Sequence, residues 1–325
     1  MNILVTGGAG YIGSVATEIL QSRGYNVFVA DNLGIGRREH VEAGVPFFKE
    51  DVSNIAGISA ILEQSKIDVV MHFAAFALVG ESVEQPDKYF TNNIQGTLNL
   101  LQAMKLSNCK NFIFSSTCAV YGNPVQPTLD EKHPKNPINP YGYSKLVIEN
   151  CLDWYAEAYG FKYNIFRYFN AAGATQKHGE DRDIESHIIP IILEAAFKER
   201  SHFTIFGNDY NTKDGTCIRD YIHVTDLAEA HILGIENLNY HPRAVYNLGT
   251  GDGYSNLEVV NAVKEITGID FDVKFGERRP GDPDVLVASA GKANRELKWI
   301  PKHSDLKNII ETAFEWKKVL LRNKR

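Results

Sequence analysis

Short apolar runs alternate with helical segments along the first half of this chain, and this alternation constrains the fold more than any other feature. The runs are rich in β-branched residues and apolar on both faces, which is typical of strands in a parallel sheet covered by helices on both sides. Strict alternation of strand and helix predicts an α/β fold with a doubly wound parallel (Rossmann) sheet. The predicted strands are Asn2–Thr6, Asn26–Ala30, Phe47–Val52, Ile67–Ala75, Asn111–Ser116 and Tyr163–Asn170.

The alternation of strand-like and helical segments stops after Asn170. A polar, loop-like stretch leads into an apolar helix that begins at Ile188, whereas residues 220–251 return to the pattern of the first half. We therefore expect a smaller mixed α/β domain built from two separate segments. The expected division is 1–172 plus 223–254 for the Rossmann domain, and 173–222 plus 255–325 for the smaller one.

Composition excludes several classes of protein. The chain has 325 residues, of which 44% are hydrophobic, enough for a sizeable core. Its net charge of −6 argues against nucleic acid or an anionic membrane as the main partner. It has neither a charged-then-apolar leader nor a run of about 18 apolar residues, so we expect a cytoplasmic protein. The four cysteines and ten histidines show no metal-ligand spacing, which predicts reduced thiols and no structural metal.

A glycine-rich turn joins the first predicted strand to a helix that begins at Tyr11. Gly7, Gly10 and Gly13 fit G-x-x-G-x-x-G. The first permits a tight turn, the second lets backbone approach a pyrophosphate, and the third allows close helix–strand packing. The helix N-terminus offers amide hydrogens and a positive dipole to the phosphates. Asp31 ends the second strand, where a carboxylate accepts hydrogen bonds from ribose hydroxyls and repels a 2′-phosphate. The motif therefore predicts NAD rather than NADP.

Arg37 and Arg38 are the contrary indication, because arginines near this strand end can hold the 2′-phosphate of NADP. They lie several residues into the loop, so a surface role is the simpler interpretation. Further cofactor contacts are expected where the next strands end. These are Asp51 and Val52 at the adenine edge, and Phe73, Ala74 and Ala75 beside the phosphates and ribose.

The stretch "NPYGYSK", from Asn139 to Lys145, holds two tyrosines near one lysine. Side chains at i and i+4 share a helix face, whereas those at i and i+2 point apart, so Tyr141 can meet Lys145 and Tyr143 cannot. A phenol ionises near pH 10, too high for a general base at neutral pH. A neighbouring ammonium and a positive nicotinamide would both lower that pKa. We therefore expect Tyr141 to be the catalytic base; the alternative is an ordinary surface side-chain pair at a helix start.

With these parts in place, the chain resembles the extended short-chain dehydrogenase/reductase family, and within it the nucleotide-sugar 4-epimerases. The resemblance covers essentially the whole chain. It rests on "VTGGAGYIG", "HFAA", "NNIQGT", "FIFSSTCAVYG", "PYGYSK", "RYFNAAGA", "FGNDYNTKDGTCIRDYIHV" and "RRPGDP". It implies reversible epimerisation at carbon 4 of a UDP-hexose (UDP-galactose to UDP-glucose), through a transient 4-keto sugar and a tightly bound NAD.

The resemblance also assigns site residues. Thr117 matches the position that hydrogen-bonds the 4-oxygen of the sugar and helps pass its proton to Tyr141. Further positions that match cofactor contacts are Tyr11, Ile12, Asn32, Asn92, Tyr141, Lys145 and Phe169. The positions where the family holds the UDP-sugar are Thr117, Tyr141, Asn170, His187, Ile188, Thr204, Ile205, Phe206, Arg219, Arg279 and Asp282. Guanidinium groups match diphosphate oxygens well. Surface ion pairs for the arginines, and turn capping for Asn170 and Asp282, are the alternatives.

Two departures from the family pattern affect the expected site. Ala77 stands where many members carry a lysine that touches the cofactor, which would loosen NAD. Leu286 stands where some members close the sugar pocket with a tyrosine, so N-acetylated sugars are a hypothesis.

Other activities remain open at this point. A UDP-N-acetylhexosamine or UDP-uronate 4-epimerase is an alternative, whereas a 4,6-dehydratase is disfavoured because Cys118 and Ala119, not acidic residues, follow Thr117. A non-catalytic NAD-binding scaffold could lose the tyrosine, lysine or threonine, but this chain keeps all three. The helices before Ser107 and after Tyr141 could form a homodimer face, or could instead pack on the chain's own sheet.

Overall fold

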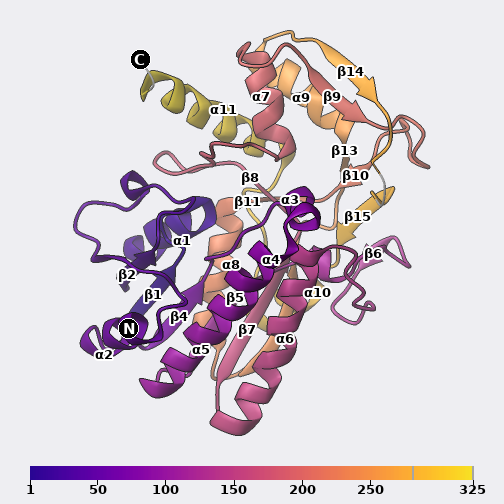
Figure 1. The fold of residues 1–325 in the computed structure, drawn as a ribbon. Coiled ribbons are helices and arrows are strands. Elements are labelled where there is room, and N and C mark those ends of the chain that lie inside the picture. Colours follow the sequence, from indigo (N-terminus) through magenta and orange to yellow (C-terminus); the bar gives the residue numbers. More distant parts are fainter. Residues whose placement is uncertain (280–281, 324–325) are drawn as a thin grey trace.

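Seven parallel strands form the central sheet, in the order β12-β7-β5-β4-β1-β2-β3 (Figure 1). The computed structural model describes residues 1–279 and 282–323. The order reverses between β1 and β4, and ligands of doubly wound sheets bind beyond the carboxyl ends of the strands at such a point. The predicted Rossmann fold is confirmed. The strands are β1 (Asn2–Thr6), β2 (Asn26–Asp31), β3 (Phe47–Lys49), β4 (Val69–His72), β5 (Asn111–Thr117), β7 (Lys162–Tyr168) and β12 (Arg243–Leu248).

Helices cover both faces of this sheet because its strands are apolar on both sides. One face packs against α1 (Tyr11–Ser22) and α8 (Val224–Asn237). The other packs against α2 (Ile55–Gln64), α5 (Gly96–Leu106) and α6 (Pro140–Tyr159). Among the described residues, no helix is long and apolar enough to cross a membrane.

The helical stretch before Ser107 is interrupted by a wider turn. It consists of α4 (Pro86–Tyr89), a π-helical segment (Phe90–Gln95) and α5. Such π-helical insertions are frequent at functional sites, and this one carries Asn92. The short helix α3 (Val79–Glu84) precedes it.

A smaller lobe lies beyond the carboxyl ends of the sheet strands (Figure 1). Its core joins three helices and two parallel strands through buried side chains such as Ile192, Val259 and Ile309. These elements are α7 (Ile188–Ala196), α9 (Asn256–Thr267), α11 (Leu306–Asn323), β9 (Phe203–Phe206) and β14 (Val273–Gly276).

Short strands connect the two lobes. They are β6 (Thr128–Leu129), β8 (Asn170–Ala172), β10 (Ile218–Arg219), β11 (Tyr221–His223), β13 (Tyr254–Ser255) and β15 (Val285–Ala288). β8 pairs with β11, and β10 lies between β13 and β15. Hydrogen bonds between these short strands therefore join the two lobes.

One helix of the C-terminal segment packs with the large lobe. Ala293 and Leu297 of α10 (Gly291–Leu297), together with Trp299, are buried in the core formed by α1 and α8. The expected division assigned all of 255–325 to the smaller domain, whereas these three side chains pack with the large lobe.

Candidate active site

A cavity of about 460 Å³ opens beyond the carboxyl ends of β1, β2, β4 and β5. Its walls come from segments that are far apart in sequence: the glycine-rich turn, the end of β2, the start of α6, and a loop of the smaller lobe. Of the expected cofactor contacts, Gly7, Gly10, Tyr11, Ile12, Gly13, Asp31, Asn32, Val52, Phe73, Ala74, Ala75, Asn92, Tyr141 and Lys145 line it.

Each glycine of the turn is required for a different reason. Gly7 has a φ of +75°, and a Cβ there would lie 2.5 Å from the Ala74 nitrogen. A Cβ on Gly13 would lie 2.2 Å from the Gly7 oxygen, so helix and turn could not approach. A Cβ on Gly10 would meet only the Gly7 oxygen, at 3.3 Å, and would otherwise occupy the cavity margin. Gly10 caps α1 without a side-chain hydrogen bond. The turn therefore fits a pyrophosphate.

Asp31 presents its carboxylate at the other end of this wall. Its oxygens accept hydrogen bonds from the backbone amides of Ala9 (3.0 Å) and Leu33 (2.8 Å), which fixes the group's orientation. Burial raises the pKa of Asp31, and these two hydrogen bonds work in the opposite direction. Each oxygen keeps acceptor capacity for a ribose hydroxyl.

Two expected cofactor contacts lie away from the cavity wall. Asp51 is one hydrogen bond removed, because its Oδ2 accepts from the side chain of Asn32 at 2.7 Å. Phe169 is buried in a separate apolar cluster with Val120, Tyr121 and Leu129. Ala77, which stands where many family members carry a lysine, lines the cavity. Another lysine, Lys88, lines the same cavity and forms an ion pair with Glu81.

Tyr141 and Lys145 lie on the cavity wall, whereas Tyr143 lies outside it. Tyr143 is 51% exposed and packs edge-on against Phe90. Thr117, the last residue of β5, lies close enough to Tyr141 to oppose the rise in its pKa. The Lys145 ammonium donates to the Ser115 carbonyl at 2.9 Å. The helix-face argument thus separated the two tyrosines in the way that the structure shows.

The protein groups by themselves leave the pKa of Tyr141 raised. Burial raises it, and nearby Thr117 and the charge of Arg182 oppose that rise only in part. Burial also lowers the pKa of Lys145, to about 7, so its own positive charge is incomplete at neutral pH. The lowering expected from Lys145 and the nicotinamide together stays a prediction.

A buried ion pair lies behind Lys145, and sequence reasoning missed it. Glu149, one helical turn after Lys145, pairs with Arg167 of β7 and accepts a hydrogen bond from Ser116 at 2.6 Å. The Glu149 carboxylate opposes the loss of charge on Lys145. The spacing of Lys145 and Glu149 is a signal, but Arg167 comes from another strand and could not be paired from sequence.

Two more unanticipated side chains position this wall. Asn93 is buried, accepts from the Phe76 amide (2.9 Å), and donates to the Phe76 carbonyl (3.0 Å) and to Ser144 (3.2 Å). It therefore ties the loop after β4 to the start of α6. Tyr168 lines the cavity, and its hydroxyl forms a hydrogen bond with Ser115.

The expected sugar-nucleotide residues gather at the junction of the lobes. Arg219 forms an ion pair with Asp282, and the Asp282 carboxylate also accepts from Tyr210 at 3.3 Å. The Arg279 guanidinium lies 4.1 Å from the centre of the Phe206 ring. Arg219 lies close enough to Cys118, the neighbour of Thr117, for its charge to oppose the rise in the thiol's pKa that burial causes.

The remaining expected contacts differ in what they offer. Ile205 is fully buried, so this position presents backbone only, whereas Thr204 and Phe206 on either side are half-buried. Asn170 donates to the Asp220 carbonyl at 2.9 Å, which holds β8 to β11. In the part of the chain that the structure describes, the dinucleotide cavity is lined by none of the residues Asn170, Thr204, Ile205 and Phe206.

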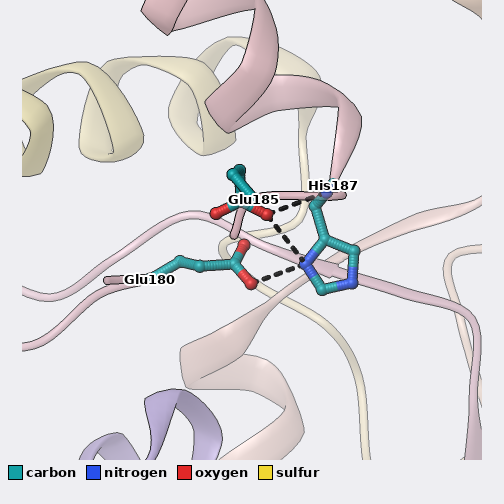
Figure 2. A group of neighbouring side chains, drawn as sticks. All are labelled: Glu180, Glu185 and His187. Carbon is teal, nitrogen blue, oxygen red and sulfur yellow. Dashed lines mark hydrogen bonds and ion pairs between the residues drawn. The ribbon is translucent and has the colours of Figure 1, made fainter. Parts of the chain in front are cut away.

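His187 and two glutamates form a compact group just before α7 (Figure 2). The His187 Nδ1 lies 2.6 Å from Glu180, and Glu185 accepts the His187 backbone amide at 2.8 Å. The spacing would suit a metal ion. However, Glu180 also pairs with Arg182 at 2.9 Å, and its charge raises the pKa of His187 against the effect of burial. The group is therefore a satisfied ion-pair cluster, with Ile188 next to it at the start of α7.

Comparison with known proteins agrees with this geometry. Residues 3–249 match the model of the NAD dependent epimerase/dehydratase family. A UDP-glucose 4-epimerase of Lactobacillus helveticus is 48% identical over 98% of this chain and 97% of its own length. The crystal structure of UDP-glucose 4-epimerase from Brucella ovis in complex with NAD has a TM-score of 0.94, with 45% identity over 96% of this chain and 97% of that one. The UDP-Glc/GlcNAc 4-epimerase from Campylobacter jejuni has a TM-score of 0.87, with 41% identity over 98% and 99%.

Proposed function

Because the chain belongs to the NAD dependent epimerase/dehydratase family, we propose that it interconverts UDP-galactose and UDP-glucose by NAD-dependent epimerisation at carbon 4. The observation that carries this proposal is the position of Tyr141. It lies on the wall of the dinucleotide cavity close to Thr117, with arginines at the junction beyond. The protein is an isomerase with NAD as its cofactor, and it acts through a transient 4-keto sugar.

The glycine turn and Asp31 would hold NAD by its pyrophosphate and adenosine ribose. Bound there, NAD would supply a reversible hydride acceptor for carbon 4 and the positive charge of its ring. The charge matters because the protein alone raises the pKa of Tyr141.

The chain's own residues then move one proton and hold the nucleotide. Tyr141 takes the proton of the 4-hydroxyl, directly or through Thr117, and returns it after the sugar has turned. Arg219 and Arg279 anchor the diphosphate through both half-reactions. Anchoring by the diphosphate leaves the hexose free to present either face. No net oxidation occurs, because the hydride removed from carbon 4 is returned to carbon 4.

Dehydration is disfavoured by the residue after Thr117. Burial raises the pKa of the Cys118 thiol to about 12, so this group cannot act as the additional acid or base near neutral pH.

A direct assay tests the function. Purified enzyme and UDP-galactose are mixed with no added NAD, and UDP-glucose is followed. Conversion without net formation of reduced NAD is expected. Conversion only after NAD is added would contradict a tightly held cofactor. Failure in both cases would contradict the substrate, and UDP-uronates would be the next compounds to test.

N-acetylated sugars form a second substrate class, favoured by Leu286. This half-buried side chain lies opposite Arg219 in the β10–β15 pairing and packs on the cluster of Val120, Tyr121 and Phe169. Replacement by tyrosine adds a ring and a hydroxyl at this position. We expect turnover of UDP-N-acetylglucosamine by the wild type, and a Leu286→Tyr variant that loses it while UDP-galactose turnover persists. No detectable wild-type rate would exclude this second class.

We also propose that the enzyme is a cytoplasmic homodimer that buries the outer face of α5 and α6. Tyr143 and Trp154 are three helical turns apart on α6 and are 51% and 74% exposed, and Leu106 on α5 is 59% exposed. The proposed partner is a second copy of this chain. Light scattering should give twice the chain mass, and Trp154→Glu should give the monomer. A monomeric wild type would end this part of the proposal.

A further inference from the structure

A loop of the smaller lobe crosses one wall of the dinucleotide cavity. Its residues Asp181, Arg182, Asp183 and Ile184, which we call the strap, line the same cavity as Gly10 and Asp31. The strap lies between β8 and α7, so it belongs to no part of the Rossmann motif. Sequence reasoning treated this stretch as a polar loop.

Arg37 connects the strap to the Rossmann domain. Its Nε lies 2.8 Å from Asp181 and its Nη2 lies 2.8 Å from Asp183. The backbone amide of Arg37 donates to the Ala9 carbonyl at 3.0 Å, which fixes Arg37 to the glycine turn. His40, also on the cavity wall, lies 3.6 Å from Asp181.

The base of the strap has its own anchors. The Glu180 carbonyl accepts from the Trp316 indole at 2.9 Å, and Thr175 donates to Glu18 of α1 at 2.6 Å. Lys177 pairs with Glu42 at 2.7 Å. The base of the strap is therefore held independently of the Arg37 contacts.

The strap also reaches the catalytic end of the cavity. The charge of Arg182 works against the burial that raises the pKa values of Tyr141 and Tyr168, so its guanidinium lies within electrostatic range of both rings. The strap thus extends from the Asp31 side to the Tyr141 side.

We propose that Arg37, Asp181 and Asp183 form an ionic latch that holds the strap over bound NAD, prolongs its residence, and disfavours NADP by neutralising Arg37. This deepens the proposed function and rests on it. A cofactor that is regenerated in every cycle must stay bound through many turnovers. The same two carboxylates keep the Arg37 guanidinium away from a 2′-phosphate, and they add negative charge beside Asp31. Asp31 favours NAD, whereas a free Arg37 could hold the 2′-phosphate of NADP. With Arg37 neutralised by the two carboxylates, both residues favour NAD.

The first test measures NAD release without any sugar. NAD-loaded enzyme is diluted into NAD-free buffer, and retained NAD is followed by rapid gel filtration. Arg37→Ala should release NAD about fivefold faster or more, since two partly exposed ion pairs are lost. High salt should accelerate release from the wild type but not from Arg37→Ala. Arg37→Lys keeps the charge and should restore part of the retention.

Lys177→Met is the matched control, because it removes an ion pair at the base of the same strap. Its NAD release should match that of the wild type. Release from Arg37→Ala that matches the wild type, or equal acceleration in Lys177→Met, would overturn the latch. Thermal unfolding of each variant checks that the fold is intact, and Arg37→Lys keeps the test decisive if Arg37→Ala does not fold.

The second test concerns NADP. An Asp181→Asn/Asp183→Asn variant frees Arg37 and should bind NADP about tenfold more tightly than the wild type, and adding Arg37→Ala should cancel this gain. No gain would overturn the selectivity part. Neither test uses a sugar, so slow release of NAD by an enzyme that does not turn over UDP-galactose would fault the proposed substrate and leave the latch standing.

Discussion

Tyr141 is partly buried beside Thr117 while Tyr143, two positions later on the same helix, faces outward. The i/i+4 relation to Lys145 was enough to separate them from sequence. The charge state of the site could not be read in the same way. It depends on how far Lys145 and Tyr141 are removed from solvent, and their surroundings include Ser115 of β5 and Tyr168 of β7, which are distant in sequence.

Removal of the phenolic hydroxyl tests the role of Tyr141. We expect Tyr141→Phe to lower kcat for UDP-galactose by about 10³-fold, within the range for loss of a general acid–base group. Tyr143→Phe, the matched control, should stay within about twofold of the wild type. Equal losses in the two variants would show that Tyr141 has no special part in proton transfer.

At the scale of elements, α6 begins where it does for local reasons. The Asn139 side chain accepts from the Gly142 amide at 2.8 Å, and Pro140 occupies the first turn. A Cβ on Gly142 would lie 2.5 Å from the Ala119 carbonyl oxygen, so the helix start packs directly on the turn after Thr117. This contact sets the distance from Tyr141 to Thr117.

Gly142→Ala should therefore reduce catalysis without touching any reacting group. The added methyl collides with backbone, the helix start must shift, and we expect kcat to fall about tenfold or more while NAD is retained. Gly80→Ala is the control, because a Cβ there meets nothing within 4 Å. Unchanged kcat in Gly142→Ala would mean that the start of α6 tolerates displacement.

The strands that form continuous apolar runs could be predicted from the sequence, whereas the short strands between the two lobes could not. β1, β2, β4, β5 and β7 follow from their buried runs. β10 and β13 have two residues each, and their pairing depends on the arrangement of both lobes rather than on local sequence. Arg219 lies on β10, so its assignment to the sugar-nucleotide site came from the family resemblance and not from the pattern of the chain.

At the scale of the whole molecule, we propose the two-domain division with residues 291–299 reassigned to the Rossmann domain. Their burial beside α1 and α8 supports this change. Sequence alone could not show it, since α10 follows the smaller lobe's strands without any change in composition.

Three buried histidines make the fold sensitive to acid. Burial lowers the pKa of His72 to about 3, and those of His223 and His231 to about 4. Between the ordinary pKa near 6.5 and these values, the unfolded chain binds more protons than the folded one. The free energy of unfolding should therefore fall as the pH falls from about 6.5 to 4, by up to about 1.4 kcal/mol per pH unit for each histidine.

His231→Phe tests this directly. The ring packs among Phe73, Phe166 and Tyr168, so phenylalanine suits the site. Denaturant titrations at pH 7, 6, 5 and 4 should show a shallower loss of stability in the variant than in the wild type. His202→Gln, near the surface before β9, should follow the wild type. Parallel curves for His231→Phe would contradict the pH account.

In the proposed reaction, carbon 4 of the sugar is oxidised and then reduced again while NAD stays bound to the enzyme. An isotope experiment tests this directly. Enzyme with no added NAD is given UDP-galactose that carries deuterium at carbon 4, and the UDP-glucose formed is examined by NMR. We predict that the deuterium stays at carbon 4, because the same hydrogen is removed and returned within one closed site. Hydrogen from solvent at carbon 4 would contradict the account, since it would require removal of that hydrogen as a proton.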